Sequence, residues 1–115
     1  MTPLEKMTFF EMEIAKATIP SNLLKQQSNF EEIHSEILKY LNTEMKDTDA
    51  NSRIIQMILG KLKYIKDEHM SMSFIKDSTK RAELLSKKIV ETEKALKAEI
   101  DILKMYIVVG IIVKK

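Results

Sequence analysis

The sequence has 115 residues, of which 44% are hydrophobic and 31% are charged, and its formal net charge is +2. It contains no cysteine, two glycines and two prolines, which excludes a disulfide framework, a cysteine-ligated metal site, a thiol nucleophile and a glycine-rich phosphate loop. Because turns between strands consume glycine and proline, the composition predicts an all-α protein that forms one helical domain over residues 1–115.

The charge is divided unevenly along the chain. Residues 1–50 carry five lysines and nine acidic residues, a net charge of −4, whereas residues 51–115 carry fourteen basic and eight acidic residues, a net charge of +6. Lysine outnumbers arginine seventeen to two. Since base reading and bidentate phosphate binding favour arginine, a nucleic-acid partner is not expected.

Residues 1–46 carry the signals of two N-terminal helices. Thr2-Pro3-Leu4-Glu5 is a capping box with proline at the first helical position, and Ile19-Pro20 should end that helix. Ser28-Asn29-Phe30-Glu31 is a second capping box, and apolar residues at helical spacing continue from it to Met45. Residues 21–28 between the helices are open to two interpretations, a helical turn or a loop. The polar residues 47–52 then predict a turn.

The remaining residues, 53–113, predict a long C-terminal helix. Its apolar residues alternate at spacings of three and four, which is typical of a coiled coil, and the pattern weakens between residues 71 and 79. Asp77-Ser78-Thr79 can therefore cap a separate helix or lie on the surface of a continuous one. We favour one helix from residue 52 to 109, roughly 85 Å long at 1.5 Å per residue, on which the two N-terminal helices pack as an elongated bundle.

So long a helix cannot be covered by the 50 residues that precede it, so part of its apolar stripe should bind a partner. The expected partner is a second copy of the chain or a helix of another protein. The residues predicted to make this contact are Ile55, Ile58, Leu62, Ile65, Leu85, Ile89, Leu96, Leu103 and Ile107.

Residues 105–113 are apolar without interruption, and two lysines follow them. Nine residues fall well short of the approximately 20 that span a bilayer, which leaves three interpretations. The segment is buried in an oligomer or partner contact, it anchors the chain at a membrane surface, or it pairs as a strand, since six of the nine residues are β-branched. The membrane interpretation assigns contact to Tyr106, Ile107, Val108, Val109, Ile111, Ile112, Lys114 and Lys115.

The sequence offers no pattern of catalytic residues. Glu31-x-x-His34 is half of a di-iron motif whose second half is missing, and both histidines read as partly buried, hydrogen-bonded side chains. We therefore expect a non-catalytic interaction and assembly protein without metal or cofactor. The first residues lack a secretory signal pattern, which predicts a cytoplasmic location, with the membrane surface as the alternative. Eight methionines suggest core packing or a pliable helix-binding groove.

Overall fold

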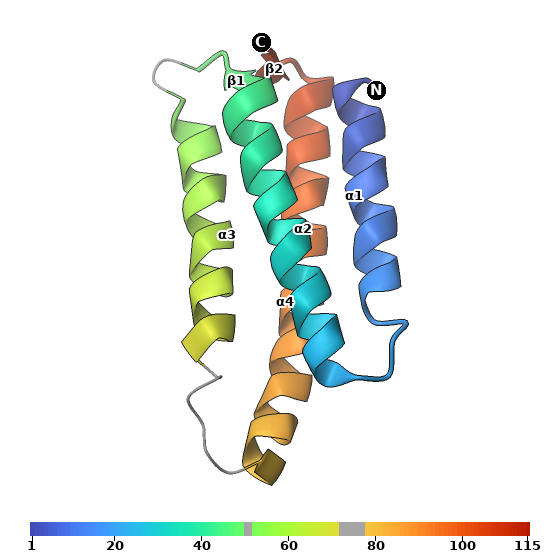
Figure 1. Ribbon diagram of the computed structural model, residues 1–115. Coiled ribbons are helices and arrows are strands. Elements are labelled where there is room, and N and C mark those ends of the chain that lie inside the picture. Colours follow the sequence, from blue (N-terminus) through green and yellow to red (C-terminus); the bar gives the residue numbers. More distant parts are fainter. Residues whose placement is uncertain (50–51, 72–77) are drawn as a thin grey trace.

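The computed structural model describes residues 1–49, 52–71 and 78–115. In these residues consecutive helices run in opposite directions, which makes an up-and-down four-helix bundle with a two-stranded sheet at one end (Figure 1). The all-α class is confirmed. The elements are α1 (Pro3–Ala17), α2 (Leu23–Glu44), β1 (Met45–Asp47), α3 (Arg53–Ser71), α4 (Ser78–Val108) and β2 (Ile112–Lys114).

Helix α1 begins as predicted. The Thr2 hydroxyl accepts a hydrogen bond from the Glu5 backbone N–H at 3.2 Å, and the Glu5 carboxylate accepts one from the Thr2 backbone N–H at 3.1 Å. This reciprocal pair satisfies two backbone donors that a helix start leaves open. The helix ends at Ala17, three residues before Pro20.

Helix α2 begins earlier than the second capping box predicts. Its N-cap is Asn22, whose side-chain oxygen accepts hydrogen bonds from the backbone N–H groups of Leu24 and Lys25 at 2.9 and 3.2 Å. Residues 28–31 therefore lie inside the helix, and the capping box predicted there is wrong. The physical reason is that Asn22 already supplies a cap, and Leu23 packs on the hydrophobic core from the turn that follows.

The long C-terminal helix is shorter than predicted. Helix α4 does pack against the two N-terminal helices, but the single helix over residues 53–113 is wrong, because α3 and α4 are separate and antiparallel (Figure 1). The longest dimension of the molecule is 47 Å. Helix α4 begins at Ser78, which agrees with the alternative of a separate helix, whereas Asp77 lies outside the described residues. The predicted turn at 47–52 is replaced in part by β1, and residues 50–51 also lie outside the described part.

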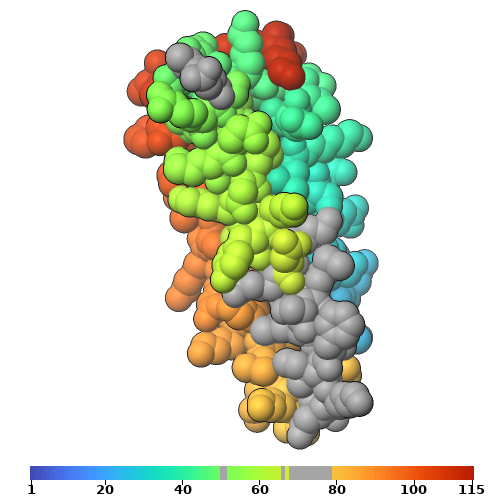
Figure 2. Space-filling view, turned by 90° about the vertical axis from the view of Figure 1, so that its left-hand side faces the viewer, coloured from blue at the N-terminus to red at the C-terminus, as the bar shows by residue number. Residues whose placement is uncertain are grey.

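The helices are arranged so that α1 and α3 are diagonal. Helix α1 packs against α2 and α4, and α3 packs against the same two helices. Figure 2 shows the α3 face in green, with α4 in orange on one side of it and α2 in teal on the other. An ion pair between Lys61 of α3 and Glu99 of α4, at 3.5 Å, joins two of these neighbours.

The core runs along the centre of the bundle and receives side chains from all four helices. Burial of large apolar side chains is the main stabilising contribution in such a bundle. The largest side chains that are fully buried are Met7, Phe10, Ile14, Phe30, Ile37, Leu41, Met45, Ile58, Leu62, Leu96, Ile100 and Leu103.

The two strands close the end of the bundle where both termini lie (Figure 1). They pair antiparallel, with Met45 opposite Lys114 and Asp47 opposite Ile112. Thr48 extends the contact, because its backbone N–H and its hydroxyl both donate hydrogen bonds to the Ile111 carbonyl, at 2.8 and 2.7 Å. The C-terminal segment is thus fastened to the junction between α2 and α3.

Candidate functional site

The residues predicted to bind a partner lie in the chain's own core. Seven of the nine are buried, and Ile65 and Ile107 are half-buried. The expectation of an uncovered stripe is therefore wrong. Its physical reason is the reversal of direction between α3 and α4, which turns both halves of the stripe toward α1 and α2. The buried seven are Ile55, Ile58, Leu62, Leu85, Ile89, Leu96 and Leu103.

The apolar run at residues 105–113 divides into three parts. The last turn of α4 leaves Val108 and the following Val109 exposed, at 70% and 61%. Gly110 then turns the chain with φ of +79°, a left-handed conformation that glycine adopts without strain. Beyond it Ile112 is fully buried in β2, so the strand interpretation holds for residues 112–114.

The other residues assigned to membrane contact are half-buried or exposed. Tyr106, Ile107 and Ile111 are half-buried and pack on the core, whereas Lys114 and Lys115 are exposed. Ile112 is therefore a correction to the predicted membrane set. No helix in the described residues has the length and apolar character needed to cross a bilayer.

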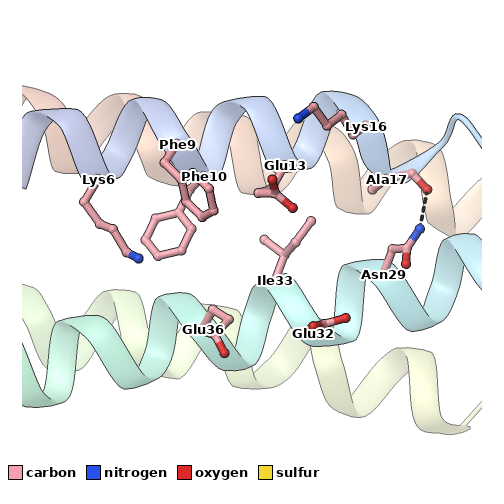
Figure 3. A pocket seen from close by; sticks show the side chains of 10 residues that line it. All are labelled: Lys6, Phe9, Phe10, Glu13, Lys16, Ala17, Asn29, Glu32, Ile33 and Glu36. Carbon is pink, nitrogen blue, oxygen red and sulfur yellow. Dashed lines mark hydrogen bonds between the residues drawn. The ribbon is translucent and has the colours of Figure 1, made fainter. Parts of the chain in front are cut away.

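A groove between α1 and α2 forms a cavity with a volume of about 390 Å³ (Figure 3). It is open to solvent along the seam of two antiparallel helices. Phe9, Phe10 and Ile33 give it apolar walls. The remaining lining residues are polar or small: Lys6, Glu13, Lys16 and Ala17 from α1, and Asn29, Glu32 and Glu36 from α2.

Side-chain contacts hold the groove at both ends. At one end the Asn29 side-chain amide donates a hydrogen bond to the Ala17 carbonyl at 3.2 Å, which ties the end of α1 to α2 (Figure 3). At the other end the Phe10 and Tyr40 rings meet edge to face, with centroids 6.0 Å apart. The Lys6 ammonium lies over both of these rings, at 5.2 and 5.7 Å from their centroids. These contacts fix the spacing of the two helices, so the groove is largely preformed.

Three carboxylates surround the apolar walls. Glu13 comes from α1 and Glu32 and Glu36 come from α2, and in the described part of the chain none of them makes an ion pair. Helices α1 and α2 together carry seven glutamates and four lysines, a net charge of −3. The groove therefore offers an apolar surface within an acidic pair of helices. Such a surface favours a ligand that is both apolar and cationic.

The sequence pattern did not predict this groove. Helical periodicity identifies the face of a helix that points to the core, but it carries no information on the gap between two packed helices. The adjacent aromatic residues at 9 and 10 were the one available signal, because only one of two consecutive helical residues can face the core.

Two features relevant to metal binding complete the description. His34 is completely buried in α2, and the His69 side chain lies outside the described part. Across the described ranges there is no group of three or more histidine, cysteine, aspartate or glutamate side chains that could hold a metal ion.

Comparison with protein-family models, with curated proteins and with solved structures finds no significant match to this chain.

Proposed function

We propose that this chain is a non-catalytic interaction protein that binds a basic amphipathic helix of another protein in the groove between α1 and α2. The observation that supports the proposal is the combination of Phe9, Phe10 and Ile33 with carboxylates that make no ion pair within the described residues. Phe9 and the acids at 32 and 36 are exposed, so they add little to the stability of the bundle itself. They suit a partner that supplies apolar side chains and positive charge together.

A helix fits this groove better than an extended peptide. The groove runs along the seam of two helices, and a third helix laid on such a seam places apolar residues at positions i, i+3, i+4 and i+7 against it. No sheet edge borders the groove, since both of its walls are helical. Lysine or arginine residues beside that apolar stripe would then face Glu13, Glu32 and Glu36.

The small volume of the groove limits the affinity of the expected complex. A cavity of about 390 Å³ accepts only a few side chains, so most of the partner helix stays in solvent. Association also costs translational and rotational freedom. We therefore expect a dissociation constant on the order of 10–100 μM, as for transient recognition.

The proposal is tested with a fluorescein-labelled helical peptide of leucine and lysine, about 18 residues long so that it forms a helix on binding. Fluorescence anisotropy should give a saturable curve with the full chain. Reversal of two groove charges in Glu32→Lys/Glu36→Lys should weaken binding about tenfold or more, because attraction becomes repulsion. Glu83→Lys, the same reversal at an exposed site on α4, should leave binding unchanged.

A second peptide, in which glutamate replaces lysine, keeps the apolar stripe and reverses the charge. The proposal requires that this peptide binds much more weakly than the leucine–lysine peptide. Equal binding of the two peptides, or equal binding by the groove variant and Glu83→Lys, would overturn the proposal.

The second candidate function is contact with a membrane surface by the end of the bundle that carries the C-terminus. Val108 and Val109 are exposed there, and Lys114 and Lys115 are exposed close to them in the chain. Exposed apolar side chains beside lysines favour the interface of an anionic bilayer. This candidate would place the protein at the periphery of a membrane, which is the alternative location that the sequence predicts.

Co-sedimentation with vesicles tests this candidate. Binding to vesicles that contain anionic lipid, but not to neutral ones, is expected for the natural chain. Val108→Ser/Val109→Ser should reduce the bound fraction, whereas Val90→Ser, at an exposed valine earlier in α4, should not. Equal sedimentation of both variants, or none by the natural chain, argues against membrane contact.

A further inference from the structure

Helix α1 has a second apolar surface, on the side that faces away from the core. Phe9 and Met12 are exposed there, at 38% and 52%, and a shallow depression of about 380 Å³ lies over them. Met1 and Leu4 extend the surface toward the start of the chain. Because α1 packs only on α2 and α4 among its larger contacts, this outer surface is open to solvent.

The residues of the outer stripe of α1 are spaced symmetrically along the helix. Glu5, Phe9, Met12 and Lys16 follow one another at spacings of four, three and four, which places them on one face of a helix. When two such helices lie antiparallel, Glu5 of one meets Lys16 of the other, and Phe9 meets Met12. Each pair occurs twice, so the apolar pairs occupy the centre and an opposite-charge pair closes each end.

The two charges alone have a simpler explanation. An acid near the start of a helix and a lysine near its end both stabilise the helix through its dipole. That explanation does not cover the two large apolar side chains exposed between them. Only an antiparallel pair of α1 helices brings opposite charges together and apolar side chains together at the same time.

We infer that a second copy of this chain packs on the outer face of α1, with a two-fold axis that passes between Phe9 and Met12. Such an isologous contact is the commonest form of homodimer. Glu5 to Lys16 spans about 16 Å at 1.5 Å per residue, so the interface is small. We expect a weak dimer with a dissociation constant on the order of 100 μM. The inference does not rest on the proposed function, and Phe9 and Lys16 also line the groove on the α2 side of α1.

Sedimentation of the full chain tests the inference. The mass should rise with concentration from the 13.4 kDa of one chain toward twice that value. Lys16→Glu faces Glu5 with a like charge in both pairs, and should weaken the dimer about tenfold or more. Lys25→Glu, the same reversal at an exposed site on α2, should leave it unchanged.

The decisive arm mixes two variants. Glu5→Lys alone brings two lysine side chains together at each end of the interface, so it should weaken the dimer about as much as Lys16→Glu does. In an equimolar mixture of the two variants, each end of the mixed dimer joins a lysine of the Glu5→Lys chain to a glutamate of the Lys16→Glu chain. The mixture should therefore dimerise at close to the natural strength. A mixture that stays at the mass of one chain would overturn the inference.

The double variant Glu5→Lys/Lys16→Glu restores the pairing. Each end of its dimer again joins opposite charges, with the two signs exchanged, so it should dimerise at close to the natural strength. A double variant that stays monomeric while it remains folded, or a natural chain that stays at the mass of one copy at millimolar concentration, would overturn the inference.

A disulfide measurement covers the case in which Glu5→Lys fails to fold, since that change also removes the capping box with Thr2. The natural chain has no cysteine, so Phe9→Cys and Met12→Cys each carry one thiol. Under mild oxidation the mixture should form the mixed disulfide faster than either variant forms its own. Faster formation of the two symmetric disulfides contradicts the antiparallel pairing. Reduced Met12→Cys should bind the leucine–lysine peptide as the natural chain does, because Met12 does not line the groove. Loss of the dimer and loss of peptide binding are thus measured separately.

Discussion

Asp47 caps helix α3 from strand β1, because its carboxylate accepts a hydrogen bond from the backbone N–H of Ile54 at 2.9 Å. The same carboxylate accepts a second bond from the Asp49 backbone N–H at 2.8 Å. Asp47 is itself buried, and its strand partner is Ile112. One side chain therefore joins the start of α3 to the closing sheet.

Replacement of this cap should destabilise the whole bundle. Asp47→Ala leaves backbone donors at the start of α3 without a partner, so the free energy of unfolding should fall by about 2 kcal/mol. Urea unfolding followed by circular dichroism measures the change. Asp101→Ala removes an exposed aspartate on α4 and should cost less than about 0.5 kcal/mol. Similar losses in both variants would show that Asp47 is not a cap.

The two glycines should respond to alanine in opposite directions. Gly60 lies inside α3, and an added Cβ would meet no atom within 4 Å. Gly60→Ala should therefore raise the free energy of unfolding by about 0.5–1 kcal/mol, through better helix propensity. Gly110 has φ of +79°, so Gly110→Ala should lower it by about 1 kcal/mol. Thermal unfolding of the two variants side by side checks the opposite signs.

Residues of the apolar stripe should behave as core. Leu62 is fully buried, so Leu62→Ala should cost about 2–5 kcal/mol. Met57→Ala, on the exposed side of the same helix, should change stability by about 0.5 kcal/mol or less. Chemical unfolding gives both values, and sedimentation should show no change in dimerisation for either variant. If Leu62→Ala reduced association without reducing stability, Leu62 would belong to a partner-binding surface, as the sequence predicted.

Tyr40 makes the bundle sensitive to alkali. Burial raises the pKa of its phenol above the ordinary value of 10.0, and the Glu44 carboxylate raises it further. Because the pKa of Tyr40 is higher in the folded state than in the unfolded state, its contribution to the free energy of unfolding is fully present below the ordinary pKa. That contribution is lost as the pH rises through the raised pKa. Tyr40→Phe should therefore lose less stability than the natural chain between neutral pH and about pH 11. Tyr64→Phe, at an exposed tyrosine, should follow the natural chain.

Local signals predicted part of this fold. The two partners of the first capping box, Thr2 and Glu5, lie within four residues, so the sequence alone predicts their contact. Two hydrogen bonds confirm it. The sequence did not single out Asp47 as the cap of α3, because Asp47 acts on Ile54 through the geometry of a strand that forms only when β2 joins β1. That pairing brings together residues from distant parts of the sequence, and no local pattern encodes it.

The error over the long helix has a different cause. Ile58 and Leu103 fall on one regular apolar stripe, and this pattern is the same whether the helix is continuous or folds back on itself, since both arrangements bury the same face. The candidate groove was missed for a related reason. Phe9 and Glu32 come from different helices, and only the packed bundle sets the distance between them.

Nuclear magnetic resonance of the ¹⁵N-labelled chain with the leucine–lysine peptide tests the proposed function most directly, because it locates the binding surface residue by residue. The amide signals of Phe10, Ile33 and Glu36 should move with increasing peptide, while those of Val90 and Lys94 on α4 stay in place. Movements confined to α3 and α4, or no movement at millimolar peptide, would contradict the proposal.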